Sequence, residues 1–92
     1  MNKDLKEFNI NDFVFLNKSI EQLNWRPGRF RPEPIINPIK MKIKSVTYSK
    51  SRGYIYQLKG ISFDNSDINK IIFKTYSEAL ENMNSSNNKY DN

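Results

Sequence analysis

Residues 39–58, IKMKIKSVTYSKSRGYIYQL, contain the pattern that decides the fold. Apolar and polar residues alternate along most of this stretch, and a period of two is typical of a β-strand with one buried face. The alternation changes phase near Lys44-Ser45, which predicts a β-bulge that restores the register of one bent strand. Residues 49–53, SKSRG, predict a hairpin turn, because the glycine can adopt positive φ. We therefore expect two antiparallel strands here.

Three further short strands and a helix are predicted on either side of this hairpin. Residues 8–16, FNINDFVFL, are apolar at most even positions and on both faces at the end, so we expect a strand covered on both sides there. Residues 61–63 and 71–73 are short apolar segments separated by the turn sequence DNSD. Residues 75–78, TYSE, form a capping box, and the apolar stripe after it predicts a short helix packed on the strands.

The connection between the first two strands, residues 17–38, is long and irregular. SIEQ at residues 19–22 has capping-box spacing and predicts one or two helical turns. NWRPGRFRPEP follows at residues 24–34, and its prolines and glycine exclude regular structure. We expect Trp25 to pin this insertion to the core, with Phe30 as a second candidate for that role. The groups expected to point outward are the side chains of Arg26, Arg29 and Arg31.

These elements predict one mainly β (α+β) domain over residues 8–83. Hydrophobic residues make up 37% of the chain, which is enough for a small core. About five short, mostly antiparallel strands with a C-terminal helix predict a small, strongly bent barrel. We expect residues 1–7 to be a flexible N-terminus. Residues 84–92 are expected to be a disordered tail, because they hold little to bury.

Two segments resemble known small proteins. FNINDFVFL resembles the opening strand of small SH3-like barrels, in which an acidic residue precedes an apolar run, as Asp12 does here. IIFKTYSEALENM, residues 71–83, resembles the end of small accessory proteins of phages and plasmids, where a last strand turns into a helix. The resemblance covers residues 8–16 and 43–83. It implies an SH3-like barrel and an accessory role, and it carries over no functional residue.

The residue types that are missing exclude much of enzyme chemistry. The sequence has no cysteine and no histidine, so disulfides, thiolate metal sites and the commonest general base are all unavailable. Asp64 and Asp67 lie in a turn where carboxylates ordinarily cap backbone amides, and the loop that follows fails the EF-hand pattern. We therefore predict a protein that is not an enzyme and that holds no cofactor and no metal.

Nothing in the sequence indicates a membrane segment. The first residues, MNKDLKEFNI, do not contain the apolar stretch of a signal peptide. The longest apolar run, Phe13–Leu16, is far too short to span a bilayer. We expect a cytoplasmic protein that does not contact a membrane.

Positive charge is concentrated in the middle of the chain. The net charge is +5, yet residues 25–60 contain nine Lys and Arg against Glu33 alone, and the segments on either side are net negative. The candidate binding residues come from this block and belong to the insertion, one strand and the hairpin tip. They are Arg26, Arg29, Phe30, Arg31, Lys40, Lys42, Lys44, Lys50 and Arg52.

These residues favour binding to nucleic acid, and they leave a second function open. Guanidinium groups suit phosphates, and lysines at alternate strand positions stand about 6.6–7 Å apart, close to the spacing of successive phosphates. Lysines on a strand can also serve simply to prevent edge-to-edge aggregation. The alternative is a small protein-binding accessory or inhibitor of a mobile genetic element, which docks on an acidic protein surface through a Trp/Arg cluster.

Overall fold

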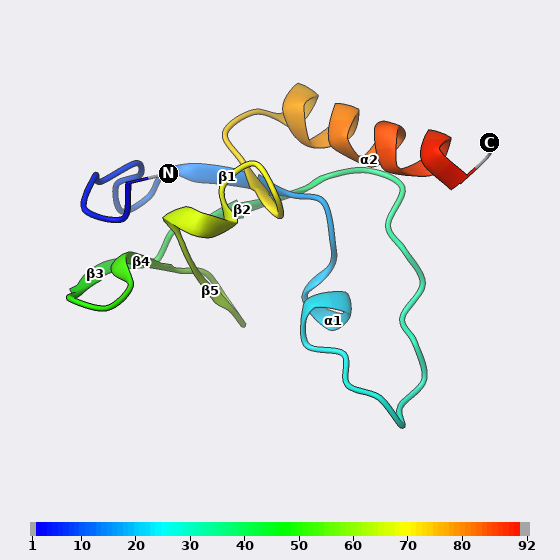
Figure 1. Cartoon of the computed structure of the whole chain (residues 1–92), viewed down its shortest axis with the longest axis horizontal. Helices are drawn as coiled ribbons and strands as arrows, with labels where there is room; N and C mark the ends of the chain where they lie inside the picture. Colours follow the sequence, from blue (N-terminus) through cyan, green and yellow to red (C-terminus); the bar gives the residue numbers. More distant parts are fainter. Residues whose placement is uncertain (1, 91–92) are drawn as a thin grey trace.

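The computed structural model of the protein describes residues 2–90, with side chains as far as residue 85, and shows a mainly β fold (Figure 1). Two three-stranded antiparallel sheets share one core, and a helix follows the last strand. In chain order the elements are β1 (Phe13–Leu16), α1 (Ile20–Leu23), β2 (Ile39–Lys42), β3 (Ser45–Ser49), β4 (Gly53–Gln57), β5 (Ser62–Asp64), the 3-10 turn η1 (Asn65–Asp67), β6 (Ile72–Phe73) and α2 (Tyr76–Tyr90).

Sheet A has the strand order β2-β1-β6, so the N-terminal strand is its centre. Val14 and Leu16 are fully buried on one face of β1, where Leu16 pairs with Ile39 and Ile72. The opposite face carries Phe13 and Phe15, because successive side chains of a strand point to opposite sides. Sheet A therefore has an inner, apolar face that is buried and an outer face that carries these two phenylalanines.

Sheet B is the meander β3-β4-β5, and its first turn confirms the predicted hairpin. Ser49 pairs with Gly53 across the turn, and Gly53 has a φ of 78°, a conformation that favours glycine. Tyr56 of β4 pairs with Phe63 of β5, and both rings are buried and stacked, with centroids 5.1 Å apart. These two aromatic side chains supply much of the core contributed by sheet B.

The prediction of one bent strand over residues 39–48 is wrong. The chain leaves one sheet and enters the other between two consecutive residues. The Ile43 amide donates to the Asp12 carbonyl (2.8 Å), which extends sheet A, whereas the Lys44 amide donates to the Gln57 carbonyl (2.7 Å) of sheet B. The phase change therefore marks a crossing between sheets instead of a bulge. Among the described residues, the strand pairings do not close the two sheets into a barrel.

The prediction of a strand over residues 8–16 is also wrong for the first half of that range. A turn precedes β1, in which the Asn9 amide donates to the Asp12 carboxylate (2.8 Å) and Asn11 adopts a φ of 75°. Asn and Asp favour such turns because their short side chains bond to the nearby backbone. The turn leaves Ile10 55% exposed while Phe8 still reaches the core.

Residues 2–7, expected to be flexible, are bonded to the domain through the buried side chain of Asn65. Its Nδ2 donates to the carbonyls of Asn2 (2.8 Å) and Leu5 (2.6 Å), and its Oδ1 accepts from the Tyr56 hydroxyl (2.9 Å). Burial raises the pKa of Tyr56, which keeps this hydroxyl protonated as a donor. Residue 1 lies outside the described residues.

Both predicted capping-box sequences begin a helix, and the reciprocal pair of bonds is formed at α1. Ser19 and Gln22 exchange the two expected bonds at α1, and Thr75 accepts from the Glu78 amide (3.2 Å) at the start of α2. α2 packs against β6 and β1 with Ala79 buried, and it continues to Tyr90 through most of the expected tail. Residues 91–92 of that tail lie outside the described residues. Neither helix within residues 2–90 has the length and hydropathy that a bilayer-spanning segment requires.

Candidate functional site

The arginine loop, residues 24–34, folds around its own tryptophan. The Trp25 indole nitrogen donates to the Arg29 carbonyl (3.1 Å), and the Arg31 guanidinium carbon lies 4.9 Å from the centre of the indole ring. Trp25 is half-buried, but it is not among the partly buried hydrophobic side chains that pack against the core, so it holds the loop together and does not pin it to the core as expected. Phe30 is fully exposed, so the expectation that it helps to pin the loop is wrong as well. Arg26, like the other two arginines, is exposed, as predicted.

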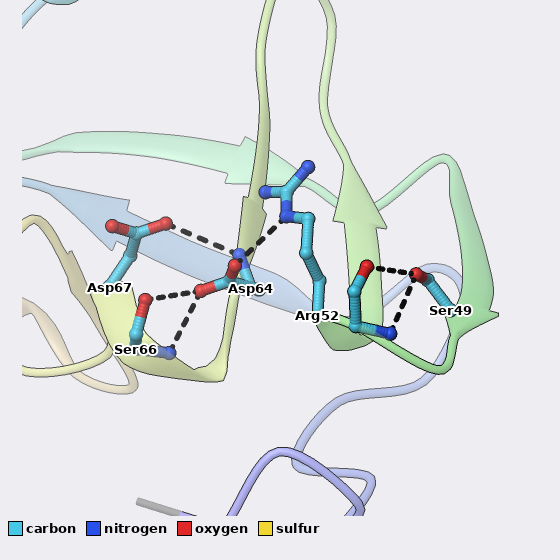
Figure 2. Close-up of polar contacts among 6 residues, drawn as sticks. Ser49, Arg52, Asp64, Ser66 and Asp67 are labelled. Atoms are coloured by element: carbon cyan, nitrogen blue, oxygen red, sulfur yellow. Dashed lines mark hydrogen bonds and ion pairs between the residues drawn. The ribbon is translucent and has the colours of Figure 1, made fainter.

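The hairpin tip has mixed charge. Arg52 Nε lies 3.1 Å from Asp64 Oδ2, so this guanidinium is already paired (Figure 2). The Ser66 hydroxyl and the Arg52 side chain both lower the pKa of Asp64, which holds the carboxylate in its charged form. Lys50 is exposed, and its carbonyl accepts a hydrogen bond from the Lys3 ammonium. Of the two predicted binding residues here, Lys50 is the one whose side chain forms no ion pair among the described residues.

A further acidic side chain lies at the same end of the molecule. The Tyr48 hydroxyl donates to Asp4 Oδ1 (2.6 Å), and this hydrogen bond raises the pKa of Tyr48. The tyrosine ring packs edge-to-face on Tyr54, with centroids 5.2 Å apart. Asp4 and the Asp64 turn together reduce the positive potential of the hairpin tip, which makes it a weaker site for phosphate than the sequence suggests.

The outer face of sheet A brings two lysines to an aromatic ring. Phe13 pairs with Lys42 and Phe15 pairs with Lys40 across β1 and β2, so all four side chains stand on this face. The Lys40 and Lys42 ammonium nitrogens lie 4.3 Å and 5.6 Å from the centre of the Phe13 ring. Phe13 is nevertheless 47% exposed.

α2 adds a second exposed aromatic side chain to the same face. Tyr76, its first residue, packs edge-to-face on Phe15 with ring centroids 6.0 Å apart, and it is 43% exposed. Its hydroxyl donates to Asn37 Oδ1 (3.3 Å), which ties the ring to the end of the long β1–β2 connection. We call this set the aromatic–lysine face, and it consists of Phe13, Phe15, Lys40, Lys42 and Tyr76.

The sequence pattern did not identify the aromatic members of this face. The run of apolar residues at the end of the predicted strand indicated burial on both sides, which holds for Phe15 only in part and fails for Phe13. The available signal was the pairing of an aromatic strand with a strand of alternating lysines. That signal depends on knowing that β1 and β2 are neighbours, which the local pattern does not give.

Eight of the nine predicted binding residues fall into three separate groups, and Lys44 joins none of them. Figure 1 shows the β3–β4 hairpin at the left of the molecule and the arginine loop at the lower right, with β1 and β2 between them. Lys40 and Lys42 share the outer face of β2, whereas Lys44 follows the end of that strand and is bonded to sheet B. The predicted binding residues therefore do not form one continuous surface, and the two on β2 belong to the aromatic–lysine face.

Neither a metal site nor a related protein indicates what the aromatic–lysine face binds. Within the part of the chain that the structure describes, no group of three or more acidic side chains is placed to hold a metal ion. The chain matches no family model, no curated protein and no solved structure. The resemblance to SH3-like accessory proteins of phages and plasmids stays a prediction.

Proposed function

We propose that the protein is a non-enzymatic, cytoplasmic nucleic-acid-binding module that uses the aromatic–lysine face. The observation that carries the proposal is the position of two lysine ammonium groups beside a half-exposed aromatic ring on one sheet face. Neither lysine forms an ion pair with any side chain within residues 2–85. Both charges are therefore free to contact phosphates, which supply most of the affinity in such complexes.

Protection of a sheet edge does not account for the whole face. β2 is an edge strand of sheet A, and lysines on an edge strand hinder pairing with another chain. That role requires charge but no exposed aromatic side chain, and a half-exposed Phe13 makes an edge more prone to association, not less. Binding of a ligand that has both negative charge and flat aromatic groups accounts for the lysines and the ring together.

The remaining basic residues favour the same ligand at longer range. The net charge of +5 and the exposed arginine loop attract a polyanion before contact, which raises the rate of association. The arginine loop lies apart from the aromatic–lysine face. We therefore expect the loop to raise affinity in proportion to its charge and to have no effect on which ligand is preferred. A long nucleic acid could contact both regions.

We expect the protein to bind labelled nucleic acid at low salt with a dissociation constant in the micromolar range or tighter. Fluorescence anisotropy at several salt concentrations, with single- and double-stranded DNA and RNA, measures it. The log–log salt slope should correspond to about four or more phosphates, and K40Q/K42Q should reduce affinity about tenfold and lower the slope by roughly 1.4 for single strands and roughly 1.8 for B-form duplexes. K59Q/K70Q removes the same charge from two exposed lysines outside the candidate binding residues and is the matched control. Equal losses in both double variants would show that net charge alone drives binding.

A second candidate function rests on the arginine loop. Phe30 is fully exposed beside two exposed arginines, and a groove of about 460 Å³ lined by Trp25, Phe30 and neighbouring residues opens next to it. Exposed aromatic and arginine side chains are enriched among the residues that dominate protein interfaces. This combination supports an accessory or inhibitor of a mobile genetic element that docks on an acidic protein surface.

If the loop is a protein-docking site, F30A should reduce affinity for the partner by about tenfold or more, because Phe30 would be its central anchor. The measurement is a nuclease-treated pull-down followed by titration of the purified partner. L5A removes an exposed apolar side chain from a different segment and should leave affinity unchanged. A partner that binds both variants equally would contradict the assignment to the loop.

We also propose that the fold belongs to the small SH3-like barrels and that the protein is an accessory protein of phage or plasmid type. The support is the pair of small antiparallel sheets around one core, together with the direct crossing from one sheet to the other at Ile43 and Lys44. A crystal structure that superposes on small SH3-like barrels over both sheets would support the class, and one that superposes over neither sheet would contradict it.

A further inference from the structure

We propose that Phe13 is a stacking platform for a nucleobase and that the ligand of the aromatic–lysine face is single-stranded nucleic acid. This inference rests on the proposed function and narrows it to one class of ligand. It assigns the recognition of bases to a side chain that the charge pattern alone does not identify.

The first step of the argument is how the ring is held. Phe13 is the first residue of β1, and Lys42 of β2 is its cross-strand partner. The next residue, Val14, is fully buried on the opposite face of the strand. The strand pairing fixes its backbone, so little conformational entropy remains to be lost when a ligand packs on the ring. A rigid and exposed aromatic ring on a strand is the arrangement that sheet-based binders of single strands use.

The second step concerns the two lysines, which now lie against the ring. Their ammonium groups at 4.3 Å and 5.6 Å gain from the ring quadrupole while no ligand is present. Each is carried by a flexible four-carbon stem, so it can move from the ring to a phosphate without any change in the backbone. A base can then take the place on the ring, and the phosphates on either side of that base meet Lys40 and Lys42.

The third step is the length of the surface. Phe13 and Phe15 stand on alternate positions of one strand, about 6.6–7 Å apart, and Tyr76 continues the aromatic surface beyond Phe15. Tyr76 is 43% exposed, and its hydroxyl bond to Asn37 holds its position. The face therefore offers a second aromatic group in the direction of α2, where a neighbouring nucleotide can lie.

The fourth step concerns why a single strand is preferred to a duplex. In a double helix the faces of the bases are stacked on one another, so an aromatic side chain reaches a base face only where the duplex is kinked and unstacked, which costs free energy at every unstacked step. The major groove of an undistorted duplex admits a helix or a narrow two-stranded ribbon. The outer face of sheet A has three strands, with α2 packed on β1 and β6, and so has a different shape. A single strand presents both its phosphates and its base faces to such a surface.

We expect the protein to bind labelled oligothymidylate more tightly than a duplex of the same length, and we expect F13L to lose about tenfold in affinity for the single strand. Leucine keeps the apolar bulk and removes the π-face, and F13Y restores the π-face and should retain affinity. The salt slope should be the same for F13L and the wild type, because no phosphate contact is lost. Anisotropy titration measures each of these, and circular dichroism verifies that the variants fold.

The outcomes separate this inference from the proposed function. Loss of single-strand affinity in F13L, with recovery in F13Y and an unchanged salt slope, supports the platform. If single strand and duplex bind with equal affinity and F13L has no effect, the stacking role of Phe13 is overturned. The protein is then a nucleic-acid-binding module whose affinity depends on charge. Absence of binding to any nucleic acid at low salt overturns both.

Discussion

Replacing Asn65 with alanine should lower the free energy of unfolding by about 3 kcal/mol, because it removes all three hydrogen bonds of a buried side chain at once. Asn65 is 1% exposed, and its side chain joins the Tyr56 hydroxyl to the carbonyls of Asn2 and Leu5. The substitution leaves all three of those groups without their partner. Urea denaturation followed by circular dichroism measures the loss, which is a large part of the stability of a domain this small.

Two variants define what a smaller or absent effect would mean. Y56F removes only the hydroxyl, which bonds to Asn65 and to the Glu7 amide (2.8 Å), and should cost about 1–2 kcal/mol. N9A changes an exposed asparagine in the turn before β1 and should stay within about 0.5 kcal/mol of the wild type. If N65A falls in the range of N9A, residues 2–7 are not bound to the domain as described.

Replacing Gly53 with alanine should lower the free energy of unfolding by about 2–4 kcal/mol, because two separate effects act at this position. The residue has a φ of 78°, which strains any side chain, and a Cβ built there would stand 2.0 Å from the Lys3 carbonyl oxygen. That carbonyl accepts from the Tyr54 amide (3.1 Å), so the N-terminal segment would have to leave β4. Urea denaturation and exchange of the Tyr54 amide measure the two consequences.

Gly28 provides the matched control for this substitution. It has a φ of 94° in the arginine loop, and a Cβ built there meets nothing within 4 Å. G28A therefore tests the backbone strain alone, for which we expect about 1–2 kcal/mol. Equal effects of G53A and G28A would show that the collision with Lys3 does not occur and that the N-terminal segment lies elsewhere.

The parts of the fold that local sequence predicts are those held by local interactions. The hairpin at residues 49–53 and the two capping boxes are bonds between residues a few positions apart, so their residue types are enough to identify them. The turn at Asn9–Asp12 is also local, but its polar residues lie inside an alternating pattern. The alternation predicts a strand over these residues, but the short side chains that favour a turn decide the structure.

Features that depend on partners far along the chain could not be predicted. Ile43 and Lys44 look like neighbours in one strand, and only the partners Asp12 and Gln57 show that they belong to different sheets. Asn65 has the composition of a turn residue, and nothing near it in the sequence indicates that it holds the N-terminal segment. The candidate site has the same origin, because Phe13 meets Lys42 through the pairing of β1 with β2.

The long connection between β1 and β2 affects which changes of amino-acid sequence the surface of this protein can accept. The entropy of closing a flexible loop grows only with the logarithm of its length, and doubling that length adds about 0.6 kcal/mol. Insertions and deletions in the arginine loop therefore change its shape and charge at little expense to the folded state. Phe13, Lys40 and Lys42 lie in paired strands, where a one-residue insertion would turn every following side chain to the other face. The loop can vary by insertion, whereas the aromatic–lysine face can vary only by substitution.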